Sequence, residues 1–398
     1  MRLTQVRATF KRFLRINQSF TRFLELTVLI KFKEVCSMNK KPKVLFILKH
    51  RESTWNGDES YTNYSSGQIS SGLSNSATFV VDALNETDLV EAKVVDVVDN
   101  NCIDREVSLF RPDVVIIEAF WVVPEKFEIL TKLHPTVKWI VRNHSEMPFA
   151  AQEGIIIDWS LEYLKYKNVF VSGNSKRSYK DIEVLVNSAY PSVSNHVVFL
   201  PNTYPTIHRR TFTPKEEDAF LDIACFGAIR PLKNHLMQAV SAIKFAEHLG
   251  KKLRFHINGG RVEGGSVSNN ILKNLRKLFE RTPNHELVEH GWYPHEKFLD
   301  VLEGMDMGLQ VSFSETFNIV GADMVHVGLP VVFSSEVLWA PWHVCADPTS
   351  SKDIYNKMRQ IWFCKDIRLH QILCQYSLNS YTADSVHQWL AELDYLLT

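Results

Sequence analysis

The sequence lacks the features that would place it within a membrane or in an oxidising compartment. No run reaches the roughly 18 apolar residues that a membrane-spanning helix needs. The six cysteines form no C-x-x-C pair and no zinc-like spacing with histidine, which excludes a metal knuckle and favours reduced thiols in a cytoplasmic protein. The formal net charge is also zero, because the 45 basic and 45 acidic side chains balance each other. From these absences we expect a folded, soluble protein.

The neutral total conceals an uneven distribution of charge. Residues 1–37 carry eight basic and two acidic side chains, which leaves 37 basic and 43 acidic ones in the remainder. A body of that sign does not attract nucleic acid as a whole. Residues 1–37 also place apolar side chains at helical spacing, so two interpretations stay open for them. In the first, they form a basic amphipathic helix that lies on a membrane surface or resembles a transit peptide. In the second, they are an appended extension or an upstream start ahead of a domain that begins at Met38.

Short β-branched runs alternate with helical patterns from Lys43 onward, which is typical of parallel sheets covered by helices. A polar segment after Pro201 separates two such series. We therefore predict an α/β protein of two tandem Rossmann-like, doubly wound domains, residues 38–205 and 214–378, with an interdomain cleft and a C-terminal helix, residues 379–398, across the junction. The expected strands are 43–48, 113–118, 138–143, 168–173 and 196–201, then 222–227, 253–258, 286–291, 307–312 and 330–335.

The functional side chains are expected where strands run into helices, because ligands of such sheets bind beyond the carboxyl ends of the strands. The stretch FGAIRPLKN, residues 226–234, ends a strand with a glycine turn and places Arg230 and Lys233 just before a helix. Two cations beside the partial positive charge of a helix N-terminus form a site suited to a diphosphate. A solvated basic loop is the structural alternative.

A second stretch, SETFNIVGAD, residues 314–323, follows the expected strand 307–312. If a helix starts near Asn318, Glu315 projects from the loop into the cleft, and Asp323 lies one to two turns along the helix. A capping carboxylate and a surface aspartate are the structural alternative. A sugar nucleotide fits the combination, because carboxylates bind hydroxyl groups while the helix terminus and the two cations bind a diphosphate.

The second half of the chain resembles glycosyltransferase family 4 and its relatives with the GT-B fold. GAIRPLKN resembles the phosphate motif of that family, and INGGR at residues 257–261 resembles its glycine-rich strand end. ETFNIVGADMVHVGLPVV at residues 315–332 resembles its E-x7-E signature, with Asp323 as the second acid. The first half matches more loosely, through SSGLSNSATFVVDAL at residues 70–84, VRNHSE at 141–146 and LPNTY at 200–204.

This resemblance implies roles for the candidate site residues. Glu315 would hold hydroxyl groups of the donor sugar, Asp323 would bind the nucleotide ribose, and His144 would contact the sugar or the acceptor. Arg230 and Lys233 would stabilise the leaving diphosphate. The other donor-binding candidates are Gly227, Asn234, Gly259, Phe317, Asn318, Ile319 and Val320, and Gly72 and Asn75 belong to a small-residue loop at the acceptor or the phosphates.

The resemblance also implies the reaction, a retaining, metal-independent transfer of a sugar from a nucleotide-diphosphate sugar to a hydroxyl acceptor. No cofactor is implied beyond the donor, and no D-x-D motif indicates a metal site. The acceptor stays open among lipids, glycans, small molecules and hydroxymethylated DNA bases, so nucleic acid enters only as an acceptor. The alternative from another class is a non-catalytic module that binds a nucleotide sugar or a polyanion; Glu315, Arg230 and Lys233 argue against it.

Overall fold

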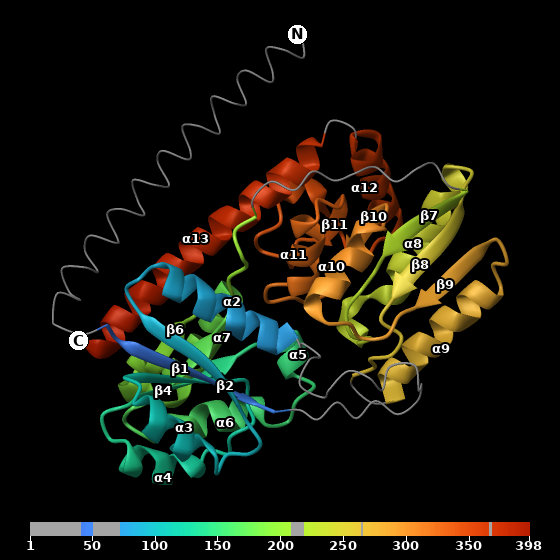
Figure 1. The fold of residues 1–398 in the computed structure, drawn as a ribbon. Helices are drawn as coiled ribbons and strands as arrows, with labels where there is room; N and C mark the ends of the chain where they lie inside the picture. Colours follow the sequence, from blue (N-terminus) through green and yellow to red (C-terminus); the bar gives the residue numbers. More distant parts are fainter. Residues whose placement is uncertain (1–40, 51–71, 208–218, 264–265, 366–367) are drawn as a thin grey trace.

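The computed structural model describes residues 41–50, 72–207, 219–263, 266–365 and 368–398. Within these ranges, two six-stranded parallel sheets flanked by helices form two Rossmann-like domains, as predicted (Figure 1). The predicted N-terminal amphipathic segment and most of the predicted linker lie outside the described residues, and the predicted domain boundaries stay predictions. None of the helices in the described part of the chain combines the length and apolarity of a membrane span.

The first sheet has the strand order β2-β1-β3-β4-β5-β6. The VVIIE run of β3 is buried at every position, because helices cover both faces of the sheet. The strands are β1 (Lys43–Lys49), β2 (Glu91–Val97), β3 (Val114–Glu118), β4 (Lys138–Asn143), β5 (Val169–Gly173) and β6 (Val197–Phe199). The helices are α2 (Gly72–Glu86), α3 (Ile103–Phe110), α4 (Lys126–Leu133), α5 (Met147–Ala150), α6 (Ile156–Tyr163), α7 (Lys176–Ala189) and the 3-10 helix η2 (Pro191–His196).

The second sheet has the order β12-β11-β10-β7-β8-β9. Its strands are β7 (Phe220–Ala224), β8 (Lys252–Ile257), β9 (His285–Glu289), β10 (Met307–Gln310), β11 (Val331–Ser334) and β12 (Cys345–Ala346). Its helices are η3 (Pro231–Lys233), α8 (His235–His248), α9 (Ser266–Glu280), α10 (His295–Glu303), α11 (Ile319–His326), η4 (Trp342–Val344) and α12 (Ser351–Phe363). The strand order reverses between β7 and β10, so the loops after these two strands border a crevice.

A long helix, α13 (Leu369–Leu397), connects the two domains. Near its start, Cys374 and Leu378 belong to the core of the C-terminal domain. Towards its end, Trp389, Leu390, Leu393 and Leu396 pack with α2 on one face of the first sheet. Figure 1 shows α13, in red, running along both domains. The helix begins earlier than the predicted one, so the predicted boundary at residue 379 falls inside it.

The segment that leaves the first sheet follows α13. Indole Nε1 of Trp389 donates to the carbonyl oxygen of Pro201 at 2.7 Å, and the backbone N–H of Tyr204 donates to Oγ1 of Thr382 at 3.1 Å. These bonds fix the path of the chain between the domains. They bring the hydroxyl of Tyr204 within hydrogen-bond distance of Asp323 in α11.

Candidate functional site

The loops after β7 and β10 line a cleft between the two domains with a volume of about 690 Å³. The N-terminal domain contributes the start of α2, the loop after β4 and α5 to the opposite wall. The predicted site residues that line this cleft are Gly72, His144, Gly227, Arg230, Lys233, Glu315, Phe317, Asn318, Ile319 and Val320. The fold therefore brings together residues that the sequence analysis selected from both domains.

Two predicted donor-binding residues, Asn234 and Gly259, are not among the residues that line this cleft or the smaller pocket described below. Asn234 is buried, and its Nδ2 donates to the carbonyl oxygens of Val311 at 3.0 Å and Pro348 at 2.8 Å. At Gly259, a Cβ atom would collide with the side chain of Glu289. Asn234 therefore holds two loops in place and Gly259 leaves room for Glu289, and the contacts of both residues to a donor stay predictions.

An ion pair connects the two motifs that the sequence analysis singled out. Nζ of Lys233 lies 2.6 Å from Oε1 of Glu315, and the side chains are 21% and 8% exposed. The backbone N–H of Phe313 donates to the carbonyl oxygen of Leu232 at 2.8 Å, which holds the two loops together. In such a partly buried site charges interact more strongly than in water. The pair therefore presents a cation and a carboxylate at one point of the cleft.

Arg230 lies beside a second arginine that the sequence analysis missed. The carboxylate of Glu263 accepts hydrogen bonds from both Arg230 and Arg261. The guanidinium of Arg230 also lies 5.0 Å from the ring centroid of Phe149 in the N-terminal domain, and that of Arg261 lies 4.2 Å from the ring of Trp292. Burial raises the pKa of Glu263, but the two arginines lower it more, so its carboxylate is ionised.

Helix α11 begins where the sequence predicts it. Asn318 is its N-cap, with φ at +64°, and Oδ1 of Asn318 accepts a hydrogen bond from the N–H of Gly321 at 2.7 Å. A Cβ atom on Gly321 would lie 2.5 Å from Cε1 of Phe333, so this turn needs glycine. Ile319 and Val320 line the cleft in the first turn, where backbone N–H groups have no partner within the helix.

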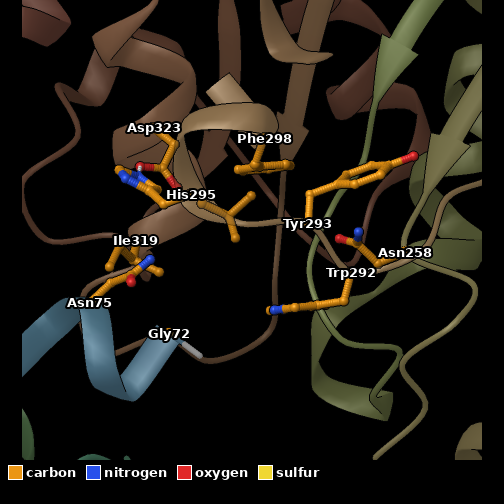
Figure 2. A pocket seen from close by; sticks show the side chains of 10 residues that line it. Gly72, Asn75, Asn258, Trp292, Tyr293, His295, Phe298, Ile319 and Asp323 are labelled. Atoms are coloured by element: carbon orange, nitrogen blue, oxygen red, sulfur yellow. Dashed lines mark hydrogen bonds and ion pairs between the residues drawn. The ribbon is translucent and has the colours of Figure 1, made fainter. Parts of the chain in front are cut away.

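A smaller pocket of about 60 Å³ lies at the same helix, and Figure 2 shows its lining side chains. Oδ1 of Asp323 accepts hydrogen bonds from the hydroxyl of Tyr204 at 2.8 Å and from Nε2 of His295 at 2.7 Å. Burial lowers the pKa of His295, but the carboxylate of Asp323 raises it more, to above its usual value. The other lining residues are Gly72, Asn75, Asn258, Trp292, Tyr293, Phe298, Ile319 and Val320.

A chain of hydrogen bonds leads from this pocket into the second sheet. The hydroxyl of Tyr293 lies 3.3 Å from Nδ1 of His290, and Nε2 of His290 lies 2.8 Å from Nδ1 of His256. Nε2 of His256 lies 2.9 Å from Oδ1 of Asp222, which also binds Arg254. Burial and the neighbouring His256 lower the pKa of His290 to about 4, so that ring is neutral at pH 7. This series of hydrogen bonds therefore fixes the loop after β9.

His144 lies at the end of β4 in the opposite wall of the cleft. Its Nε2 is hydrogen-bonded to the carboxylate of Glu118, and its Nδ1 lies 3.2 Å from Nδ2 of Asn174. Nη1 of the buried Arg142 lies 3.1 Å from Oε1 of Glu118. Burial raises the pKa of Glu118, but Arg142 and His144 lower it more; burial lowers the pKa of His144. His144 is therefore neutral, with both ring nitrogens bound inside the protein.

The loop that carries Glu315 is also attached to the N-terminal domain. Nη2 of Arg177, in α7, donates to the carbonyl oxygens of Glu315 and Glu336 at 3.0 Å each. Nδ2 of Asn174 donates to Oγ1 of Thr316 at 3.3 Å. The position of Glu315 in the cleft therefore depends on both domains.

Sequence reasoning missed several of the residues that surround the cleft and the pocket. Arg261 and Glu263 follow β8, and Trp292, Tyr293 and His295 follow β9. The rule that ligand-binding residues follow the carboxyl ends of parallel strands would have located all of these. Tyr204 had no such signal, because it comes from the segment between the domains and reaches Asp323 only through the path of the chain along α13.

No family model and no curated protein sequence matches the chain. Solved structures do match it. Sucrose-phosphate synthase from Thermosynechococcus elongatus aligns with a TM-score of 0.60 at 11% identity, over 89% of this chain and 98% of that one. The UDP-forming alpha,alpha-trehalose-phosphate synthase from Burkholderia vietnamiensis has a TM-score of 0.59 at 10% identity, over 91% and 99%. Anabaena HepE in complex with UDP and glucose has a TM-score of 0.55 at 10% identity, over 88% and 99%.

At these identities the similarity establishes the fold alone, and the predicted membership of family 4 stays a prediction. The matched structures are glycosyltransferases, and they match over almost their full lengths. Two Rossmann-like domains that share a cleft, in the arrangement of these glycosyltransferase structures, give this chain the GT-B fold.

Proposed function

We propose that this protein transfers a sugar from a nucleoside diphosphate donor to a hydroxyl acceptor. The observation that carries the proposal is the pair of Lys233 and Glu315, 2.6 Å apart in a cleft between two Rossmann-like domains. A cation for a phosphate and a carboxylate for sugar hydroxyls meet there. The fold is shared with one protein that binds UDP and glucose and with another that is UDP-forming, so UDP is the first nucleotide to test.

The nucleoside is assigned to the smaller pocket. The carboxylate of Asp323 offers ribose hydroxyls an acceptor, and Tyr204 and His295 keep it in place through Oδ1. Trp292 and Tyr293 supply aromatic surface for a base in the same pocket (Figure 2). Because the pocket and the cleft share Ile319 and Val320, a nucleoside here directs its diphosphate to the first turn of α11.

The chemical step breaks the bond between sugar C1 and the β-phosphate oxygen and forms a bond between C1 and the acceptor oxygen. The acceptor proton passes to the released diphosphate. Negative charge grows on the leaving group, where Lys233, Arg230 and the first-turn N–H groups of α11 stabilise it. Glu315 holds the sugar, and alignment of donor and acceptor lowers the barrier further.

Retention of configuration belongs to the same proposal. His144 has both ring nitrogens bound by Glu118 and Asn174, and Glu315 is paired with Lys233. Neither side chain is therefore assigned as a nucleophile. An acceptor that enters on the face from which the diphosphate leaves gives retention without one. His144 is assigned a positioning role at the sugar or the acceptor.

The direct test of this function is a screen of nucleotide sugars with release of nucleoside diphosphate as the readout. Mass spectrometry of acceptor pools then identifies the product, with separate pools of glycans, lipids, small molecules and DNA that contains hydroxymethylated bases. Formation of a glycosylated product supports the proposal. Donor binding without product in any pool indicates a non-catalytic binding module, and a protein that binds no sugar nucleotide contradicts both interpretations.

We expect turnover to survive excess EDTA. Lys233, Arg230 and the start of α11 supply the positive charge that a bound divalent cation would otherwise supply to the diphosphate. Activity is measured before and after chelation, with Mg²⁺ or Mn²⁺ added back. Loss of turnover in EDTA that either ion restores would show that the reaction needs a metal.

The two acids of the predicted signature should respond differently to neutralisation. Glu315→Gln should lower turnover by about tenfold or more while UDP still binds, because this carboxylate serves the sugar. Asp323→Asn should weaken the binding of UDP itself, because the carboxylate of Asp323 is assigned to the ribose. The first turn of α11 separates the two positions, and its length, at a rise of about 1.5 Å per residue, is comparable to that of a diphosphate. Calorimetry with UDP decides the matter, and the reverse pattern would mean that the donor lies the other way round.

A further inference from the structure

The cluster of Arg230, Arg261 and Glu263 places one carboxylate between two cations at the wall of the cleft. The three side chains are between 26% and 30% exposed. Ile229 and Val262 form an isolated parallel bridge. Through it, the backbone N–H of Ile229 donates to the carbonyl oxygen of Arg261 at 2.9 Å. Both arginines and the glutamate are therefore attached to a rigid pair of segments, and their proximity does not depend on the charges alone.

The charges in this cluster do not balance. Two guanidinium groups face one carboxylate, and the arginines keep that carboxylate ionised by lowering the pKa of Glu263. A nucleoside diphosphate brings at least two negative charges to the same wall. If Glu263 kept its bonds to both arginines, like charges would lie side by side in a partly buried site, which is unfavourable. A diphosphate and Glu263 therefore compete for the same guanidinium groups.

We propose that Glu263 is an internal occupant of the phosphate site. It holds Arg230 and Arg261 in the donor-free protein, and the diphosphate of the donor displaces it. This inference rests on the proposed function and adds Arg261 to the residues that bind the donor. Glu263 then lowers the affinity for any ligand whose phosphates bind to the two arginines. It also favours release of the nucleoside diphosphate product, because its carboxylate pairs with the arginines again as the product leaves.

The competing explanation is that Glu263 is a scaffold that orients the two arginines for the phosphates. The two explanations predict opposite effects of removing its charge. A scaffold that loses its charge binds phosphate more weakly, whereas a competitor that loses its charge no longer opposes the ligand. The amide of glutamine keeps the size of the side chain and can still accept a hydrogen bond, so Glu263→Gln separates charge from shape.

The experiment is calorimetry of the full chain with UDP and with uridine. Glu263→Gln should bind UDP about tenfold more tightly than the unmodified protein, a change typical of one rearranged charge pair. Binding of uridine should not change, because uridine has no phosphate. Glu280→Gln is the matched control: it makes the same change of charge in an exposed pair with Lys277 on α9, and UDP affinity should stay within about twofold.

A second pair of variants shows whether the effect passes through Arg261. Arg261→Ala should weaken UDP binding, and Glu263→Gln should gain less in the Arg261→Ala background than in the unmodified protein. Weaker UDP binding in Glu263→Gln, with the melting temperature retained, would establish the scaffold and overturn the inference. Unchanged UDP binding would overturn it as well, because a competitor must oppose the ligand. If the unmodified protein binds no nucleoside diphosphate, it is the proposed function that fails.

Discussion

Replacing Lys233 with alanine is expected to lower kcat/KM for the donor by about two to three orders of magnitude. The substitution removes a cation from the position where charge develops on the leaving diphosphate, and loss of one such group costs about 2.7 to 4 kcal/mol of transition-state stabilisation. It also leaves the carboxylate of Glu315, which is only 8% exposed, without its partner and next to the incoming phosphates. Both effects lower kcat/KM for the donor.

Steady-state kinetics with the donor identified by the screen, together with calorimetry of UDP, measures this loss. Lys277→Ala on α9 is the matched control, because it removes an exposed lysine from a surface pair and should leave both quantities unchanged. Lys233→Arg keeps the charge on a wider, planar group and should recover part of the activity. Unchanged kinetics and unchanged UDP affinity in Lys233→Ala would remove Lys233 from the phosphate site.

Replacing Arg142 with leucine is expected to lower the free energy of unfolding by about 3 to 5 kcal/mol, the usual result of breaking a buried ion pair at one partner. Arg142 and Glu118 have no exposed side-chain area. The guanidinium also donates to the carbonyl oxygen of Leu200 at 3.0 Å and to Oδ1 of Asn202 at 2.6 Å, and it lies 5.2 Å from a ring centroid of Trp389. Replacing Arg142 leaves the buried carboxylate of Glu118 without a countercharge. It also removes the contacts of Arg142 with β3, with the segment after β6 and with α13.

Urea denaturation measures this change, with the melting temperature as a second readout. Arg276→Leu is the control, since its pair with Glu289 is on the surface and contributes about 1 kcal/mol or less. Adding Glu118→Gln to Arg142→Leu should restore part of the stability, because no unpaired charge then remains. A loss below about 1 kcal/mol in the single variant would mean that water or another cation reaches Glu118.

Most strands could be predicted from the sequence, because those buried on both faces read as continuous β-branched runs. At the sheet edges, β6 and β9 were predicted as well, whereas β2 and β12 were not. β2 (Glu91–Val97) is at the edge of the first sheet, and its exposed positions hold charged residues that conceal the pattern. The start of α13 was missed for a related reason. Ser377, Asn379 and Thr382 are polar residues on its packed side, and they bond to the segments that the helix touches.

The sequence could predict those parts of the site that are formed by residues within one local motif or by loops at the same sheet edge. The capping turn at Asn318 and the placement of Lys233 and Glu315 in one cleft follow from residues close in sequence and from the rule for parallel sheets. The partners of those residues come from elsewhere. Glu315 is paired with a lysine of another loop, and Asp323 is held by Tyr204 from the segment between the domains. Such pairings depend on tertiary structure, which one sequence does not reveal.

The path of α13 constrains the order in which the protein can fold during synthesis. The first sheet and its helices are made early, but the face that also holds α2 is completed by Trp389, Leu390, Leu393 and Leu396. Until those residues have been synthesised, the N-terminal domain has an apolar surface open to water. Chains that expose such a surface are prone to aggregate and to engage chaperones. The domain made first is therefore completed only after α13 has been made.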